Sequence, residues 1–168
     1  MSHSEPPLVA VSACLLGQKV RYDGKDKYTQ LIAEELKKHC QLLAVCPEVE
    51  IGLGVPRAKI QLTQIEQTIR VLRKDDPQID LTDLFTDFTF KFACQHNLAG
   101  LVLQDRSPSC GMENTQLYSQ HGDIVGLASG LFTSTMRELK PDLVIIQASQ
   151  LQSKQDIASF VSSILSKQ

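Results

Sequence analysis

The sequence predicts a single-domain, three-layer α/β fold of the Rossmann-like type, with a mostly parallel sheet. The first observation behind this prediction is the alternation of short apolar runs with segments of helical spacing, which is typical of strands joined by helical crossovers. The second is that each apolar run is short, as buried strands are. The third is the length of 168 residues, which suits one domain with a real core. We expect the domain to occupy 1–168, with 1–7 flexible.

Two strands and one helix are predicted in the first part of the chain. The apolar, β-branched run 8–12 indicates the first strand. Between 28 and 40 the apolar positions recur at helical spacing, and the lysines fall in the last turn, where the helix dipole favours them. The run 42–45 indicates the second strand. Two prolines and two glycines within 46–58 predict a loop after it.

The middle of the chain predicts a hairpin followed by a long helix. The runs 60–62 and 68–72 are expected to pair as the two strands of the hairpin. Asp80 or Thr82 can cap a helix that runs to about residue 96, because the apolar positions there share one face at 3.6-residue spacing. The remaining predicted elements are a strand at 98–103, a helix at 127–139 that Pro141 stops, a strand at 143–146 and a helix at 157–165.

Composition argues against several classes of function. The net charge is −2 and no basic stripe is visible, so binding to nucleic acid or to a membrane surface by charge is not expected. Tryptophan is absent and aromatic residues make up 5%, which argues against a base-stacking surface. The N-terminus does not read as a signal peptide, and no apolar run is long enough to span a bilayer, so a cytoplasmic protein is predicted. Thiols stay reduced there, and the odd number of five cysteines does not indicate a disulfide framework.

Three cysteines, Cys14, Cys46 and Cys110, each lie just past the carboxyl end of a predicted strand. Ligands of open parallel sheets bind beyond that edge, so these thiols converge if their strands are neighbours. Soft thiolates select iron–sulfur clusters, zinc or copper(I). No pair has the CxxC spacing of zinc ribbons or of thioredoxin-type redox motifs. Free cysteine is alternatively a small buried hydrophobe, which is our expectation for Cys40 and Cys94.

A set of three thiolates would suit a cluster that keeps one metal position open. Four-iron clusters usually take four cysteines. Three ligands would leave one iron free to bind a substrate atom, by the same logic that keeps a position open in catalytic zinc sites.

The loops that carry these cysteines contain four motifs in order. They are Val-Ser-Ala-Cys-Leu-Leu-Gly at 11–17, Val-Arg-Tyr-Asp-Gly at 20–24, Val-Cys-Pro-Glu-Val-Glu-Ile-Gly-Leu-Gly-Val-Pro-Arg at 45–57, and Arg-Ser-Pro-Ser-Cys-Gly at 106–111. Over roughly 8–146 the chain resembles the TudS-like family, a former unknown-function domain family that contains the bacterial thiouracil desulfurases. The segment 48–56 and Gly-Leu-Phe at 130–132 are most similar to a branch often fused to a second, C-terminal domain, which we expect to be absent here.

The resemblance implies a 4Fe-4S cluster held by three cysteines, which match Cys14, Cys46 and Cys110, with one open iron. It implies a non-redox desulfuration in which a small thiolated compound, such as a thiouracil-like thio-nucleobase, gives the oxo product and sulfide. It also implies help from an acidic residue and a serine. Glu48 matches the acid, and Ser107 is our choice for the serine, with Ser109 second.

Each of these residues also has a plainer interpretation. Glu48 can orient or deprotonate water, or it is a solvated loop residue. Ser107 can donate a hydrogen bond to the substrate, or it bonds its own backbone in a turn. The polar residues Arg21, Asp23 and Arg57 are expected to bind the polar edge of the substrate, a phosphate, or each other.

Two other functions fit the same cysteines. The first is a sulfur-transfer enzyme that thiolates a substrate such as a tRNA base, although the composition offers few cations for unaided tRNA binding. The second is a non-catalytic module whose metal only holds loops together for partner binding. A structural zinc site normally closes with four ligands, and no fourth candidate stands beside the three cysteines. Cys40 could serve only if the end of the predicted helix reaches the crevice.

Overall fold

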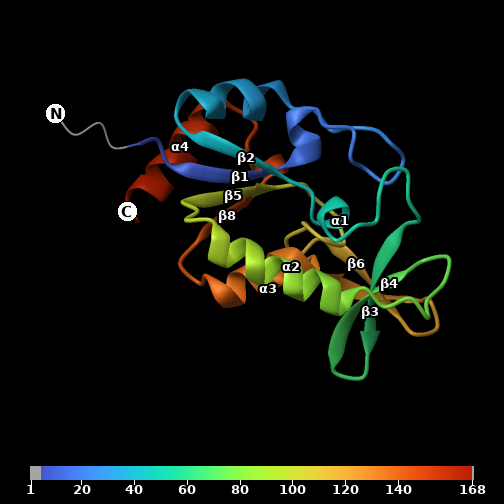
Figure 1. Ribbon diagram of the computed structural model, residues 1–168. Helices are drawn as coiled ribbons and strands as arrows, with labels where there is room; N and C mark the ends of the chain where they lie inside the picture. Colours follow the sequence, from blue (N-terminus) through green and yellow to red (C-terminus); the bar gives the residue numbers. More distant parts are fainter. Residues whose placement is uncertain (1–4, 168) are drawn as a thin grey trace.

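The computed structural model describes residues 5–167 and places the predicted parallel strands in one sheet (Figure 1). The strands are β1 (Leu8–Ser12), β2 (Gln41–Val45), β5 (Gly100–Leu103) and β8 (Val144–Gln147). Their order is β2-β1-β5-β8 and every neighbouring pair is parallel. Such a sheet must be covered on both faces, since its strands are apolar on both sides.

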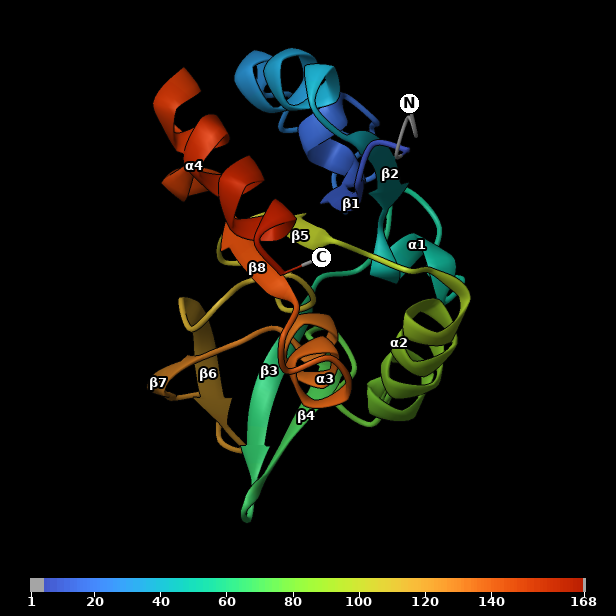
Figure 2. The same cartoon turned by 90° about the vertical axis from the view of Figure 1, so that its left-hand side faces the viewer.

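Helices cover both faces of this sheet, which confirms the three-layer α/β prediction (Figure 2). Val9 and Val11 point to one layer, made of the helical segment 31–38 and α4 (Lys154–Leu165). Ala10 and Leu101 point to the other layer, made of α2 (Thr82–Gln95) and α3 (Leu131–Leu139). The two sets of side chains alternate along β1 because successive residues of a strand face opposite sides. No described helix is long and apolar enough to cross a bilayer.

The helix expected over 28–40 is shorter and irregular. Leu31–Glu35 winds in wide π-type turns, and Leu36–Lys38 continues in tight 3-10 turns. Ile32 and Leu36 are fully buried, so the predicted apolar face does pack against the sheet. The segment 46–58, predicted to be a loop, contains a short helix, α1 (Pro47–Glu50). Its proline in the first turn and its two glutamates are the residues that a helix start favours.

A second sheet lies beside the first, with the order β4-β3-β6-β7. The predicted hairpin is present as β3 (Ile60–Ile65) and β4 (Thr68–Arg73), and it projects from the body in Figures 1 and 2. The other two strands, β6 (Thr115–Ser119) and β7 (Ile124–Ala128), are additional to the prediction. The prediction of a helix from residue 127 is wrong at its start, because β7 continues to Ala128 and α3 begins at Leu131.

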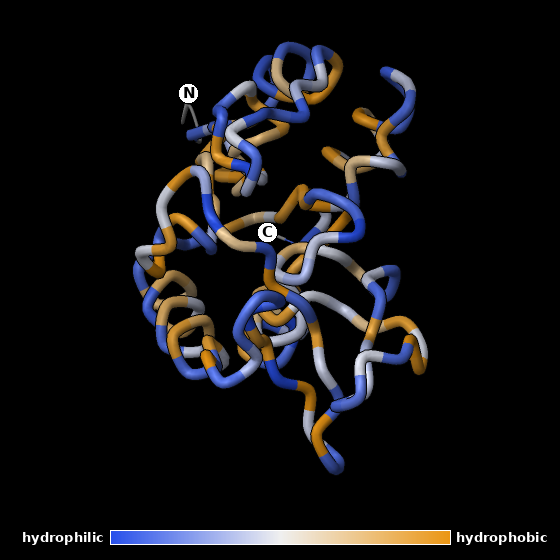
Figure 3. The backbone as a smooth tube through the Cα atoms, turned by 90° about the vertical axis from the view of Figure 1, so that its right-hand side faces the viewer, coloured by the Kyte–Doolittle hydropathy of each residue, from blue (hydrophilic) through white to orange (hydrophobic). Residues whose placement is uncertain are grey.

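The long helix α2 joins the cores of the two sheets. Phe85 near its start packs with the second sheet, and Phe92 near its end packs with the first. Figure 3 shows apolar and polar stretches alternating along the helical turns, as one buried face requires. The predicted cap is displaced, because the residue before the helix is Leu81, and Asp80 instead accepts a hydrogen bond from the Thr82 N–H at 2.9 Å.

Candidate metal centre

Three loops at the carboxyl edge of the parallel sheet bring Cys14, Cys46 and Cys110 to one cavity. β1, β2 and β5 are neighbours, so the residues that follow them open onto the same edge. The cavity has a volume of about 160 Å³ and is lined by all three cysteines. Cys14 and Cys110 are buried and Cys46 is half-buried. The convergence expected from the sequence is therefore present in the structure.

The other two cysteines lie elsewhere. Cys40 is buried in the core between the parallel sheet and its outer helices, as expected of a small hydrophobe. Cys94 is exposed on α2, so the expectation that it is buried is wrong.

Burial favours the protonated form of the three thiols. Burial raises the pKa of Cys14 to about 11 and that of Cys110 to about 12, and it also raises the pKa of Cys46. The proximity of Cys46 raises the pKa of Cys14 further. A metal that binds here must displace these protons, since the thiolate is the ligand form.

The donor set, three thiols, is chemically suited to an iron–sulfur group. Among residues 5–167, no group of three or more His, Cys, Asp or Glu side chains is arranged to hold one metal ion. A tetrahedral zinc with Zn–S bonds of about 2.3 Å would need sulfur atoms about 3.8 Å apart. The all-thiol set is the soft kind that iron–sulfur clusters take.

Glu48 lies in the first turn of α1 with both carboxylate oxygens occupied. Oε2 accepts a hydrogen bond from Arg57 Nε at 2.7 Å, and Oε1 accepts one from Ser109 Oγ at 3.1 Å. The Glu48 and Arg57 side chains are 13% and 6% exposed, so the ion pair is largely withdrawn from water. Arg57 Nη1 also donates to the Gly54 carbonyl at 2.9 Å.

The two serines before Cys110 form a directed hydrogen-bond chain. Ser107 Oγ accepts from the backbone N–H of Ser109 at 3.2 Å and of Cys110 at 3.0 Å. The two hydroxyl oxygens are 2.9 Å apart. Since Ser109 donates to Glu48, the proton between the serines comes from Ser107. Ser107 therefore bonds its own backbone, as the turn interpretation predicted, and also lines the cavity.

Close backbone packing explains two glycines at this site. A Cβ on Gly111 would collide with Thr115 Oγ1 and lie 2.9 Å from the Ser107 carbonyl. A Cβ on Gly130 would collide with the backbone of Ser109. Gly130 therefore lets the start of α3 press against the loop that carries Cys110, where the Thr133 hydroxyl donates to the Cys110 carbonyl at 2.9 Å.

Arg21 lines the cavity, whereas Asp23 is not among its lining residues. The two side chains are 4.0 Å apart and 28% and 27% exposed. Asp23 also accepts the backbone N–H of Lys25 at 3.1 Å, which closes its own turn.

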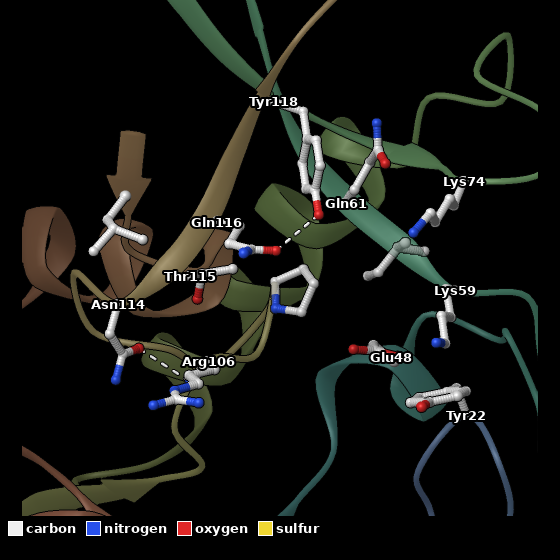
Figure 4. Close-up of a pocket in the computed structure, with 13 residues that line it drawn as sticks. Tyr22, Glu48, Lys59, Gln61, Lys74, Arg106, Asn114, Thr115, Gln116 and Tyr118 are labelled. Atoms are coloured by element: carbon white, nitrogen blue, oxygen red, sulfur yellow. Dashed lines mark hydrogen bonds between the residues drawn. The ribbon is translucent and has the colours of Figure 1, made fainter. Parts of the chain in front are cut away.

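A second, wider cavity of about 660 Å³ adjoins the first (Figure 4). The two share four lining residues, Tyr22, Glu48, Arg106 and Pro108. Lys59 and Lys74 add positive charge to its wall, and Lys59 Nζ lies 4.8 Å from the centre of the Tyr22 ring. The sequence alone did not point to these lysines, because the second sheet that brings them here was not fully predicted.

Three comparisons with known proteins bear on this site. Residues 9–148 match the family described as 2-thiouracil desulfurase. The chain is 26% identical over 113 residues to the uncharacterized protein YbbK of Bacillus subtilis (strain 168), a match that covers 62% of this chain and 73% of that protein. The fold is similar to the solved structure of the 4Fe-4S-dependent thiouracil desulfidase TudS, with a TM-score of 0.67 and 28% identity, over 95% of this chain and 99% of that one.

Proposed function

This chain belongs to the 2-thiouracil desulfurase family, and on that premise we propose that it is an iron–sulfur-dependent, non-redox desulfurase. Its substrate would be a small thiolated compound of the thiouracil-like thio-nucleobase type. The observation that carries the proposal is the single cavity shared by three cysteine thiols and an ion-paired glutamate. The similar structure of a 4Fe-4S-dependent thiouracil desulfidase supports it.

In this proposal Cys14, Cys46 and Cys110 hold a 4Fe-4S cluster. No fourth cysteine lines the cavity within the described part of the chain, so one iron would lack a protein thiolate. When bound, the cluster supplies a Lewis-acidic, sulfur-binding position.

The overall reaction balances without an electron donor or acceptor. A thiocarbonyl compound and water give the carbonyl compound and hydrogen sulfide. The carbon–sulfur bond is broken, a carbon–oxygen bond is formed, and both protons of the water end on sulfur or in solvent.

Glu48 is the residue we assign to the water. Its carboxylate faces the wide cavity in Figure 4 and also lines the cysteine cavity, so it stands where the two meet. An ionised carboxylate can only accept hydrogen bonds, and such an acceptor can orient a water and take its proton. General-base help of this kind contributes about 10²–10⁴-fold to a rate.

The remaining polar residues would assist around this carboxylate. The Ser107 hydroxyl acts through Ser109, which donates to Glu48. Arg21, which is more exposed than Arg57, is the candidate for the polar edge of the substrate, and Asp23 would orient Arg21.

Anaerobic reconstitution with iron and sulfide tests the proposal. We expect about four irons per chain, loss of iron in Cys14→Ala, Cys46→Ala and Cys110→Ala, and retention in Cys94→Ala, whose side chain is exposed. The loaded protein should convert thiouracil to uracil and release sulfide. Iron without sulfide release would favour the sulfur-transfer alternative. Zinc bound in place of iron would favour the non-catalytic module.

A further inference from the structure

Arg57 is held differently from Arg21, another of the arginines that line the cysteine cavity. Its side chain is 6% exposed, against 28% for Arg21. Its Nε donates to Glu48 at 2.7 Å and its Nη1 donates to the Gly54 carbonyl at 2.9 Å. Its backbone N–H donates to the Tyr22 carbonyl at 3.0 Å. Two of its three guanidinium nitrogens are thus engaged by protein acceptors.

The partner of Arg57 is fixed from two sides. Arg57, from the loop after α1, binds one oxygen of Glu48, and Ser109, from the loop after β5, binds the other. A carboxylate with a donor on each oxygen loses its freedom to rotate, and each oxygen keeps lone-pair capacity for a further donor. The orientation of Glu48 toward the cavity is thus set by its two partners.

The same contact compensates the burial of the Glu48 side chain, which is 13% exposed. A carboxylate withdrawn from water is unfavourable unless it is paired and hydrogen-bonded. Arg57 supplies the only salt-bridge partner that the described residues give Glu48.

We propose that Arg57 is a positioning residue: it holds the Glu48 carboxylate aimed at the reacting water, and it does not bind the substrate. This replaces the expectation, drawn from the sequence, that Arg57 contacts the substrate directly. The proposal rests on the function assigned above. Loss of a positioning residue lowers kcat, whereas loss of a substrate-binding residue raises KM, so kinetic measurements distinguish the two roles.

The experiment is a double-variant cycle with Glu48→Gln, Arg57→Gln and the combination, measured on iron-reconstituted protein with thiouracil. We expect Arg57→Gln to lower kcat at least tenfold with KM changed less than twofold. In the Glu48→Gln background, Arg57→Gln should change kcat less than twofold. Arg21→Gln is the matched control, and it should raise KM instead.

Two further measurements guard against a merely structural effect. Iron content per chain should stay at the wild-type value in each variant. Arg57→Lys keeps the charge without the planar fork, and it should recover part of the kcat lost in Arg57→Gln. Two results would overturn the proposal. The first is a rise in KM in Arg57→Gln, together with effects of the two substitutions on kcat that simply multiply in the double variant. The second is a fall in iron content that accounts for the whole loss of rate.

Failure of the proposed function would be visible separately, as wild-type protein that releases no sulfide. Urea unfolding without iron is then measured for the wild type, Glu48→Gln, Arg57→Gln and the double variant. It decides whether Arg57 holds Glu48 in place. Coupled effects on the unfolding midpoint would support the structural part of the proposal, that Arg57 fixes Glu48. Additive effects would overturn it.

Discussion

Two arginine–carboxylate pairs of this protein have the same separation of 2.7 Å but lie in different surroundings. Arg57–Glu48, at the edge of the parallel sheet, is 6% and 13% exposed. Arg70–Asp80, beside the second sheet, is 34% and 31% exposed. Solvent screens the second pair, which should contribute about 0–1 kcal/mol. The first is largely withdrawn from water, so each partner depends on the other. Pairs of equal separation are therefore expected to differ in energy, because they differ in burial.

The largest expected effect is on the reaction. Glu48→Gln should lower the desulfurase rate about 10²–10⁴-fold, because an amide cannot take the proton of the attacking water. Asp80→Asn, the same change in the exposed pair, should leave the rate near the wild-type value. Sulfide release at matched iron content measures both. An active Glu48→Gln protein would remove the distinction between the two pairs.

The next effect is on stability. Arg57→Gln should lower the free energy of unfolding by about 3–5 kcal/mol, since it leaves the largely buried Glu48 without its counter-charge. Arg70→Gln should cost under about 1 kcal/mol. Urea unfolding of the iron-free proteins gives both values. Equal costs would mean that the two pairs are equally solvated.

Glycines extend the comparison from side chains to backbone. Gly111→Ala, at the cysteine loop, should cost about 1–3 kcal/mol, because its Cβ would meet Thr115 and the Ser107 backbone. Gly126→Ala, in β7, meets nothing within 4 Å and should change stability by under about 0.5 kcal/mol. Thermal unfolding of the two variants is the measurement. A harmless Gly111→Ala would show that the loop can move aside.

The smallest effect is a pH dependence in the exposed pair. Burial opposes ionisation of Asp80, but hydrogen bonds from Thr82 and Arg70 outweigh it and lower the pKa of Asp80. A carboxyl with a lowered folded-state pKa stabilises the fold above its unfolded pKa of about 3.9, and this stabilisation is lost as pH falls through the folded-state value. Asp80→Asn should therefore cost more stability at pH 7 than at pH 3. Urea midpoints at both pH values test this, and equal costs would contradict it.

Local patterns predicted the elements of the parallel sheet because its strands are short apolar runs with sharp ends. Leu8–Ser12 is correct to the residue. β6 and β7 were not predicted because their cause is not local. Ile124, Val125 and Leu127 are exposed on β7, so no buried face marks that strand, and its pairing with β6 stabilises it.

The candidate site also has one part that the sequence predicted and another that it did not. The placement of Cys14, Cys46 and Cys110 after strands predicted their convergence, since strand ends share an edge once the strands are neighbours. Nothing in the sequence distinguished Arg57 from Arg21, because both lie in polar loops. Which of them pairs with Glu48 depends on the path of the chain between 50 and 57.

By itself, the sequence determined which chemistry is available: three soft thiols, a carboxylate and serines, at the ends of strands that any parallel sheet would align. Only the tertiary structure decided which groups are partners and which are withdrawn from water. Burial, pairing and the direction of hydrogen bonds come from segments distant along the chain, such as Ser109 and Glu48, which meet at 3.1 Å. Strand propensity is a local property, whereas the solvation of a charge depends on every segment packed around it.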